Sequence, residues 1–280
     1  MARQPMVQIA QVPTRPIIRY YGGKWKLAPW IIFHFPRHKI YVEPFGGAGS
    51  VLLSKPRSHA EIYNDADGDI VNLFRVARDQ GEDLIRSLEL TPFAREEFDL
   101  AWEQSEDPLE KARRTVIRAY MGRDPASATM RGKSSFRVYV GSKTRQTTTM
   151  QEWANFPSAL NIIISRLRGV AIENRSALDV MSAYDSDDAL HYLDPPYVFS
   201  TRADTSKYRH EMDDADHIDL IRFARKLKGM VILSGYDCEL YREILGDWHK
   251  VERKSFADGA EERVETLWMS PNFPSGGLFD

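Results

Sequence analysis

A motif of four residues at the end of an apolar run combines an acid, two prolines and an aromatic ring. Asp194, Pro195, Pro196 and Tyr197 directly follow Ala-Leu-His-Tyr-Leu at 189–193. Proline restricts φ and lacks an N–H, so the loop is stiff and its carbonyl oxygens stay free to accept. A carboxylate and a carbonyl can both accept from an exocyclic amino group, while the tyrosine offers a face to the attached ring. A proline-rich turn with aspartate as its turn former is the alternative.

A glycine-rich motif lies far upstream, at residues 43–50, with the sequence Glu-Pro-Phe-Gly-Gly-Ala-Gly-Ser. Three glycines in four positions after a short β-prone run predict a strand–turn–helix unit in which the backbone approaches a cofactor. The motif is neither the dinucleotide fingerprint nor a phosphate-binding P-loop. A second predicted strand ends at Asp65, at the spacing where Rossmann-like folds place a carboxylate on a ribose. Together these features predict an adenosine-type ligand.

The composition agrees with a soluble enzyme that uses no metal. The 280 residues can bury a substantial core, as one large domain or as a domain with an insertion. Cys238 is the single cysteine and the histidines are scattered, so we expect neither a disulfide nor a metal site. No apolar run approaches the length of a membrane span. Residues 1–16 lack a signal-peptide core and predict a flexible arm, so we expect a cytoplasmic protein without membrane contact.

Basic residues gather in one stretch of a chain whose net charge is −2. Between Lys111 and Met150 the only acid is Asp124. A local basic face can bind a nucleic-acid backbone without global positive charge, because each neutralised phosphate releases counterions. A solvated polar surface is the alternative, although it usually carries mixed signs. The candidate DNA-binding residues are Arg113, Arg114, Arg118, Arg123, Arg131, Lys133, Arg137, Lys143 and Arg145.

The same stretch is predicted to be mainly helical. A helix over 68–80 precedes it, and Thr91-Pro92 and Asp107-Pro108 each resemble an N-cap followed by proline at the first helical position. Alternation around a glycine predicts a hairpin or loop over 134–145, and a further helix spans about 150–168. On the helix after Asp107, we expect the arginines to face phosphates; on the hairpin, we expect the basic side chains to read bases.

Strands recur after this helical stretch, at 170–173, 190–193 and 230–233, with a helix at about 214–228. Alternating strands and helices predict an α/β fold with a mostly parallel sheet. We therefore expect a catalytic domain formed by 17–80 and 165–280, interrupted by an insert at 81–164.

The motifs, taken in order, resemble those of the Dam-type DNA adenine-N6 methyltransferases, of the D12 class and α group. The resemblance runs from about Arg19 to Asn272. Its C-terminal part is more similar to phage-borne members, so no target sequence is implied. The segments that carry it are Arg19-Tyr-Tyr-Gly-Gly-Lys24, the glycine motif at 43–50, Asn64-Asp65, Asp194-Pro-Pro-Tyr197 and Tyr208-Arg-His-Glu-Met212.

This resemblance implies a Rossmann-like fold and transfer of a methyl group from S-adenosyl-L-methionine to N6 of a flipped-out adenine in double-stranded DNA. The insert would recognise the target, and such enzymes can work as monomers. Asp194 and the carbonyl of Pro195 would accept the two N6 hydrogens, and Tyr197 would stack on the flipped base. The cofactor site would comprise Tyr20, Lys24, Glu43, Pro44, Phe45, Gly46, Gly47, Ala48, Gly49, Ser50, Asn64, Asp65, Asn174, Ser176 and Asp194.

Three other functions share part of this pattern. A nicotinamide oxidoreductase would also need a glycine turn and a ribose acid, but it would need neither the Asp194 motif nor a basic insert. A non-catalytic DNA-binding protein could use the same fold, although the intact tetrad argues against it. An N4-cytosine methyltransferase also holds an amino group, although a Ser-Pro-Pro-Tyr form of the tetrad is more usual there.

Overall fold

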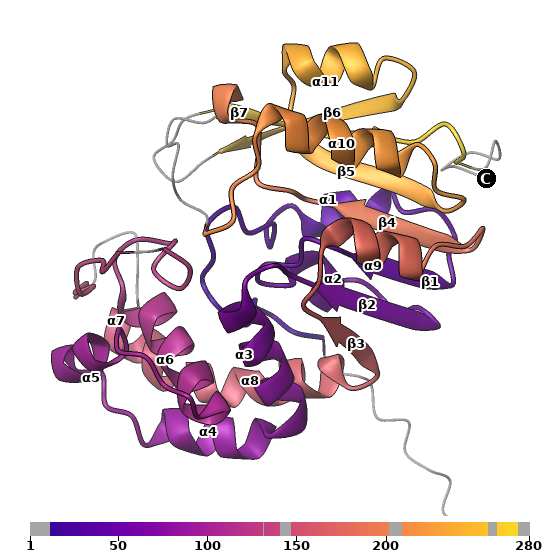
Figure 1. Cartoon of the computed structure of the whole chain (residues 1–280). Coiled ribbons are helices and arrows are strands. Elements are labelled where there is room, and N and C mark those ends of the chain that lie inside the picture. Colours follow the sequence, from indigo (N-terminus) through magenta and orange to yellow (C-terminus); the bar gives the residue numbers. More distant parts are fainter. Residues whose placement is uncertain (1–11, 131, 141–146, 202–208, 257–261, 274–280) are drawn as a thin grey trace, which may run out of the picture.

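The computed structural model describes residues 12–130, 132–140, 147–201, 209–256 and 262–273. Within these ranges the chain forms a sheet covered by helices on both faces, with a further group of helices beside it (Figure 1). The α/β architecture predicted from the sequence is therefore confirmed. No helix in the same ranges combines the length and apolar character needed to cross a membrane.

The sheet, as far as the structure describes it, has seven strands in the order β3-β2-β1-β4-β5-β7-β6. All neighbouring pairs from β3 to β5 are parallel, whereas β7 runs antiparallel to both β5 and β6. The strand order reverses between β1 and β4, which is where open α/β sheets bind ligands. The strands are β1 (Ile40–Glu43), β2 (Ala60–Asn64), β3 (Val170–Glu173), β4 (Ala189–Leu193), β5 (Met230–Tyr236), β6 (His249–Phe256) and β7 (Glu262–Met269).

Alternation along the strands divides the core into two sides. Tyr41 and Tyr192 join the cluster under α1, α2 and α3, while Val42 and Leu193 face the helices α9, α10 and α11. Successive side chains of a strand point to opposite faces, so apolar residues at adjacent positions bury both faces. These helices are α1 (Ala28–Phe33), α2 (Ser50–Ser54), α3 (Gly68–Asp79), α9 (Ala177–Ala183), α10 (Asp214–Ala224) and α11 (Glu239–Ile244).

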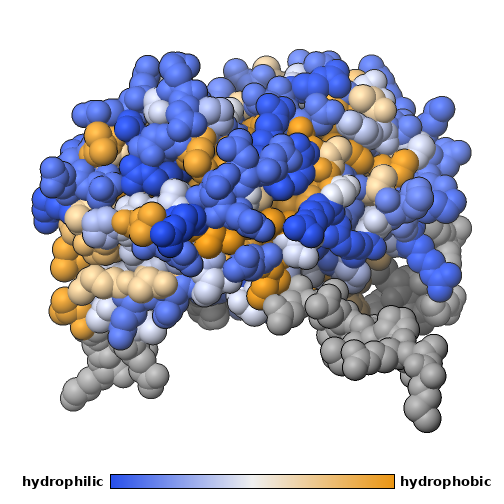
Figure 2. All heavy atoms as spheres, turned by 90° about the horizontal axis from the view of Figure 1, so that it is seen from below, coloured by the Kyte–Doolittle hydropathy of each residue, from blue (hydrophilic) through white to orange (hydrophobic). Residues whose placement is uncertain are grey.

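The insert packs as a helical group against α3 and the lower end of the sheet (Figure 1). Its apolar residues, such as Val116 and Phe156, belong to the same core cluster as Tyr41 and Leu52, so insert and sheet share one core. Seen from below, the molecular surface is mostly hydrophilic with small separate apolar areas (Figure 2). The helices are α4 (Gly81–Glu89), α5 (Arg95–Leu100), α6 (Pro108–Met121), α7 (Thr149–Ala154) and α8 (Phe156–Leu167).

Two helix starts in the insert were predicted, and one is correct. Asp107 caps α6 by accepting from the N–H of Leu109, with Pro108 in the first turn. Thr91 does not start a helix: its hydroxyl donates to the carbonyl of Ser87 at the end of α4, a helix that the sequence analysis missed. A threonine hydroxyl can bond to a carbonyl of the preceding helix or to an N–H of the following one. The Thr-Pro pair alone therefore did not determine which of the two helices Thr91 contacts.

Two further elements differ from their predictions. The helix over 150–168 is two helices that meet at Asn155, because proline disfavours a helix interior and Pro157 lies in the first turn of α8 instead. The predicted hairpin forms no strand in 132–140, where one isolated bridge joins Gly122 and Phe136, and 141–146 lie outside the described residues. A short 3₁₀ helix (Phe199–Thr201) follows the Asp194 motif.

Candidate active site

A pocket opens at the carboxyl ends of β1 and β4, where the strand order reverses. The open space in the pocket and its mouth is about 900 Å³. The glycine turn, the end of β2 and the tetrad loop all contribute to its wall. Its lining residues are Tyr20, Tyr21, Gly22, Gly23, Lys24, Glu43, Phe45, Gly46, Gly47, Ala48, Ser50, Val51, Asp65, Ala66, Asp67, Thr129, Tyr192, Asp194, Pro196, Arg209, His210, Glu211 and Met212.

The glycines of the turn are required by close contacts and by backbone conformation. A Cβ on Gly46 would lie 2.1 Å from the ring of Tyr63, and one on Gly47 would lie 2.8 Å from the ring of Tyr20. Gly47 and Gly49 also have positive φ values, of 49° and 63°. The turn therefore exposes its backbone to the pocket in a way that larger residues would prevent.

Two acids at the end of β2 lie beside this turn. Asp65 accepts from the N–H groups of Gly47 and Asp67, both at 2.8 Å, and burial raises its pKa to about 6. Asp67 caps α3, and its Oδ2 is buried without a hydrogen-bond partner among the described residues. Asp65 thus supports the glycine turn as well as lining the pocket. Asp67 is a ligand-binding candidate that the sequence analysis missed, although the Asp-x-Asp spacing was visible.

Glu43 lies at the end of β1 and holds the turn to the helix that follows. Its Oε2 accepts from the hydroxyl of Tyr41 at 2.7 Å and from the N–H of Leu52 at 3.0 Å. Burial raises the pKa of Glu43 to about 8. The side chain is therefore largely protonated at neutral pH and adds little charge to the pocket.

The carboxylate of Asp194 forms an ion pair with Lys24 at the base of the pocket. The Nζ of Lys24 lies 3.0 Å from Oδ1 of Asp194 and also donates to the carbonyl of Gly22. Burial raises the pKa of Asp194 to about 6, while the ammonium opposes that rise. Asp194 is therefore mostly ionised at neutral pH and can accept hydrogen bonds from a ligand.

Tyr197 is buried in contact with the same lysine. Its hydroxyl donates to the carboxylate of Glu265 and lies 3.3 Å from Oγ of Ser234. The Nζ of Lys24 is 4.5 Å from the ring centroid, and the ring of Tyr236 makes an edge contact at 4.6 Å. Tyr197 is not among the pocket-lining residues. Lys24 therefore covers one face of the ring that was predicted to stack on a base.

The remaining predicted cofactor residues fall into two groups. Asn64 joins two loops, since it donates to the carbonyls of Pro44 and Arg175, and Asn174 donates to the carbonyl of Asp65. Ser176 is exposed before α9. Pro44, Gly49, Asn64, Asn174 and Ser176 do not line the pocket. Those that line it are Tyr20, Lys24, Glu43, Phe45, Gly46, Gly47, Ala48, Ser50, Asp65 and Asp194.

Several lining residues were absent from the predicted site. Arg209 contacts Asp67 and Asp69 with one guanidinium nitrogen, at 3.0 Å each. Arg209 belongs to the Tyr208–Met212 motif after the tetrad, and this motif is the feature of the sequence that points to Arg209 as a site residue. Thr129 comes from the insert, and no local pattern pointed to it. No cluster of potential metal ligands occurs in the part of the chain that the structure describes.

The arginines of α6 do not form the phosphate-facing surface that we expected. Arg113 pairs with Glu97 and Glu110, Arg114 also pairs with Glu110, and Arg118 pairs with Asp69. These guanidinium side chains are only 12–14% exposed. The acids that pair with these arginines lie outside residues 111–150. The basic character of that segment in the sequence therefore overstates the basic surface in the folded protein.

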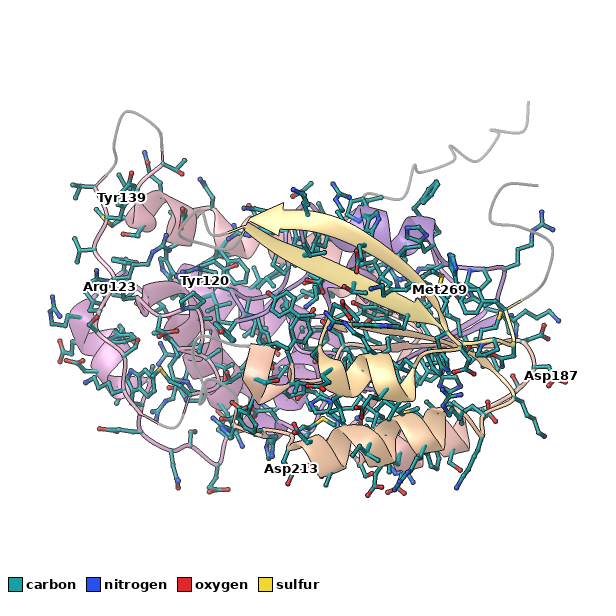
Figure 3. The ribbon with its side chains drawn as sticks, turned by 90° about the horizontal axis from the view of Figure 1, so that it is seen from above. Tyr120, Arg123, Tyr139, Asp187, Asp213 and Met269 are labelled. Atoms are coloured by element: carbon teal, nitrogen blue, oxygen red, sulfur yellow. The ribbon has the colours of Figure 1, made fainter. Side chains whose placement is uncertain are left out.

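The other basic residues of the insert differ in their surroundings. Arg137 is buried and pairs with Glu152 at 2.9 Å, so it does not project from a hairpin tip as expected. Lys133 pairs with Asp99 but remains half exposed. Arg123 is exposed at the outer edge of the insert, at the same end as Tyr139 (Figure 3). Arg131, Lys143 and Arg145 lie outside the described residues.

Comparisons with known proteins agree with this geometry. A model of the D12 class N6 adenine-specific DNA methyltransferase family matches residues 20–256. The chain is 27% identical to a DNA adenine methylase of Serratia marcescens over 250 residues, covering 85% of this chain and 87% of the relative. A DNA adenine methylase of Escherichia coli strain K12 is 26% identical over 249 residues, covering 82% of this chain and 84% of the relative.

A restriction-modification relative matches equally well. The type II methyltransferase M1.LlaDCHI of Lactococcus lactis subsp. cremoris is 27% identical over 266 residues, covering 88% of this chain and 90% of that protein. The family match favours adenine over cytosine as the target and confirms the resemblance drawn from the motifs. The chain belongs to the D12 class N6 adenine-specific DNA methyltransferases, and its reaction is the site-specific methylation of adenine in DNA.

Proposed function

We propose that S-adenosyl-L-methionine is the methyl donor and that it binds in the pocket between the glycine turn and Asp194. The observation that carries this proposal is the charge of the lining. Besides the largely protonated Glu43, the lining has four acids (Asp65, Asp67, Asp194 and Glu211) but only two lysine or arginine side chains, Lys24 and Arg209. A sulfonium is a cation, so an excess of acids in the lining favours it over an anionic pyrophosphate.

The residues present fit this donor by shape and by chemistry. The bare backbone at Gly46 and Gly47 provides a close-approach surface, and Tyr20 and Phe45 provide apolar contact area. Asp65 and the unpartnered Oδ2 of Asp67 supply acceptors for ribose hydroxyls. When bound, S-adenosyl-L-methionine supplies an electrophilic methyl group, so the chain needs no covalent nucleophile.

The chain's own contribution is to hold and polarise the acceptor nitrogen. N6 of adenine is a weak nucleophile because its lone pair is delocalised into the ring. Asp194 is mostly ionised at neutral pH, and it can accept one N6 hydrogen while the carbonyl of Pro195 accepts the other. These two bonds stabilise the positive charge that develops on N6 as the methyl group arrives.

The insert is proposed to bind double-stranded DNA and to present the target base to this pocket. Of the predicted DNA-binding residues that the structure describes, Arg123 and Lys133 are exposed, and Thr129 of the same segment reaches the pocket wall. A base must leave the duplex before its N6 can reach a buried carboxylate. Action as a monomer, location in the cytoplasm and the roles of Arg131, Lys143 and Arg145 remain predictions.

Product analysis would test this function. The purified protein is incubated with methyl-labelled S-adenosyl-L-methionine and duplex DNA, and the DNA is then digested to nucleosides. Label in N6-methyladenine is expected, and the variant Asp194→Asn should give little of it while still binding the donor. Label in N4-methylcytosine would contradict the assignment of the acceptor. Absence of donor binding to the wild type would contradict the proposed cofactor.

A further inference from the structure

Besides Asp194, one more buried carboxylate contacts the tetrad, and cofactor binding does not explain it. Glu265 is on β7, next to β5 in the sheet, and is only 3% exposed. It does not line the pocket. A buried carboxylate is costly unless it is paired and hydrogen-bonded, so its partners indicate its role.

The partners of Glu265 are all groups close to the reaction site. Its Oε1 accepts from the hydroxyl of Tyr197 and from Oγ of Ser234, the latter at 2.8 Å. The same oxygen lies 3.9 Å from Nζ of Lys24. Glu265 therefore holds the tyrosine of the tetrad at its polar end, and it attracts the lysine that contacts the tetrad.

Lys24 occupies one oxygen of Asp194 and one face of Tyr197, the two side chains on which the target base would rest. Its ammonium lies 3.0 Å from Oδ1 of Asp194 and 4.5 Å from the ring centroid of Tyr197. A flipped adenine would place its amino group on that carboxylate and its ring on that face. The lysine and the base therefore compete for Asp194 and Tyr197, and a short movement toward Glu265 would release both.

We propose that Glu265 is a positioning residue for methyl transfer. Glu265 holds Tyr197 in place through the tyrosine hydroxyl. When the target base binds Asp194 and displaces Lys24, the lysine ammonium pairs with Glu265 instead. This inference rests on the proposed function, because it requires a flipped adenine at the tetrad. The lysine keeps a buried negative partner in both positions, so its transfer leaves no unpaired charge.

The variant Glu265→Gln separates the charge from the hydrogen bonds. The amide oxygen can still accept from Tyr197 and Ser234, whereas the amide no longer attracts the ammonium. We expect Lys24 to stay on Asp194, kcat to fall about tenfold, and the Kd for S-adenosyl-L-methionine to change less than twofold. The exposed Glu252 on the neighbouring strand supplies a matched control, and Glu252→Gln should leave all these values unchanged.

Base flipping reports the proposed competition directly. 2-Aminopurine is placed at the adenine that the wild type methylates, and its fluorescence is measured with each variant. Glu265→Gln should lower the flipped fraction when Lys24 is present. In a Lys24→Met background the same change should leave the flipped fraction equal to that of Lys24→Met alone, because the competing ammonium is absent. Equal flipping by Glu265→Gln and the wild type would overturn the proposal. An equal loss in the presence and absence of Lys24 would also overturn it.

Two further measurements keep the result interpretable. Thermal unfolding identifies a variant that has lost its fold. Ser234→Ala then tests the same network, since it removes the hydroxyl that donates to Glu265 and contacts Tyr197 while the charge of Glu265 remains. Ser234→Ala should retain wild-type flipping, and loss of flipping in this variant would overturn the charge-based role. If the wild type itself forms no N6-methyladenine, the proposed function fails; if it does and Glu265→Gln is equally active, only this inference fails.

Discussion

The ammonium of Lys24 lies 3.0 Å from Oδ1 of Asp194, and both side chains are largely buried. Lys24 precedes α1 and Asp194 follows β4, so two distant segments meet at the point where the strand order reverses. Burial raises the pKa of Asp194 to about 6, and the nearby ammonium opposes that rise. The pair therefore helps to keep the proposed acceptor charged at neutral pH although the site is buried.

Replacing Asp194 should impair the reaction far more than it impairs donor binding. An acceptor that acts on charge developing in the transition state stabilises that state by roughly 3 kcal/mol and stabilises the bound ground state much less. We expect Asp194→Asn to lower the single-turnover methylation rate about a hundredfold or more. Calorimetry should give a Kd for S-adenosyl-L-methionine close to that of the wild type. Near-normal turnover by the variant would remove Asp194 from the mechanism.

The pH dependence of the rate should follow the ionisation of this carboxylate. The charged form is the active form, and the pKa of Asp194 is about 6 in the folded protein. The single-turnover rate should therefore be constant above about pH 7 and fall as the pH decreases through 6. Rates measured between pH 5 and 8 on saturating DNA would check this. A flat profile across that range would mean that Asp194 does not need its charge.

A methyl group added at the glycine turn should weaken donor binding. The Cβ of alanine at position 46 would lie 2.1 Å from the ring of Tyr63, a contact that requires the turn or the ring to move. We expect Gly46→Ala to raise the Kd for S-adenosyl-L-methionine at least tenfold. Gly132→Ala is a suitable control, since its Cβ would meet no atom within 4 Å. Equal affinity of both variants would show that the turn does not approach the donor.

A buried ion-pair cluster away from the pocket should control stability without affecting chemistry. Glu61 on β2 pairs with Lys55 at 2.7 Å and with Arg166 of α8 at 2.6 Å, and all three side chains are at most 8% exposed. Removing one partner leaves buried charges unpaired, which typically costs about 3–5 kcal/mol.

We therefore expect Glu61→Ala to lower the free energy of unfolding by roughly that amount in urea titrations, or to prevent folding. The exposed pair of Lys39 and Asp188 provides the comparison, because Lys39→Ala should cost about 1 kcal/mol or less. A similar small loss for both variants would mean that the buried cluster is not a stabilising link between β2 and α8.

Replacing two arginines of the insert should affect different properties: DNA binding for Arg123 and stability for Arg113. Arg123 is exposed, so Arg123→Ala should weaken every duplex alike and make the slope of log K against log salt shallower by about one unit. Arg113 is held by Glu97 and Glu110, so Arg113→Ala should lower the melting temperature instead. Titrations at several salt concentrations, together with thermal melts, would separate the two. An unchanged salt slope for Arg123→Ala would exclude a phosphate contact there.

Features controlled by neighbours in the sequence could be predicted without the structure. The glycine turn follows from the freedom of φ at Gly47 and Gly49, and the start of α6 follows from the Asp107-Pro108 pair. The parallel strands follow from the alternation of short apolar runs and helices. Asp194 and Asp65 could be assigned to one pocket because the carboxyl ends of parallel strands meet at the same edge of a sheet.

Features that depend on partners from distant segments required the tertiary structure. The charge of Arg113 was visible in the sequence, but its neutralisation by Glu97 depends on how α5 packs against α6. Glu265 could not be assigned to the site from the sequence because β7 lies far along the chain from the tetrad, and only the sheet order brings its carboxylate to Tyr197. Coulomb and hydrogen-bond energies depend on distance and burial in space, and sequence separation determines neither of these.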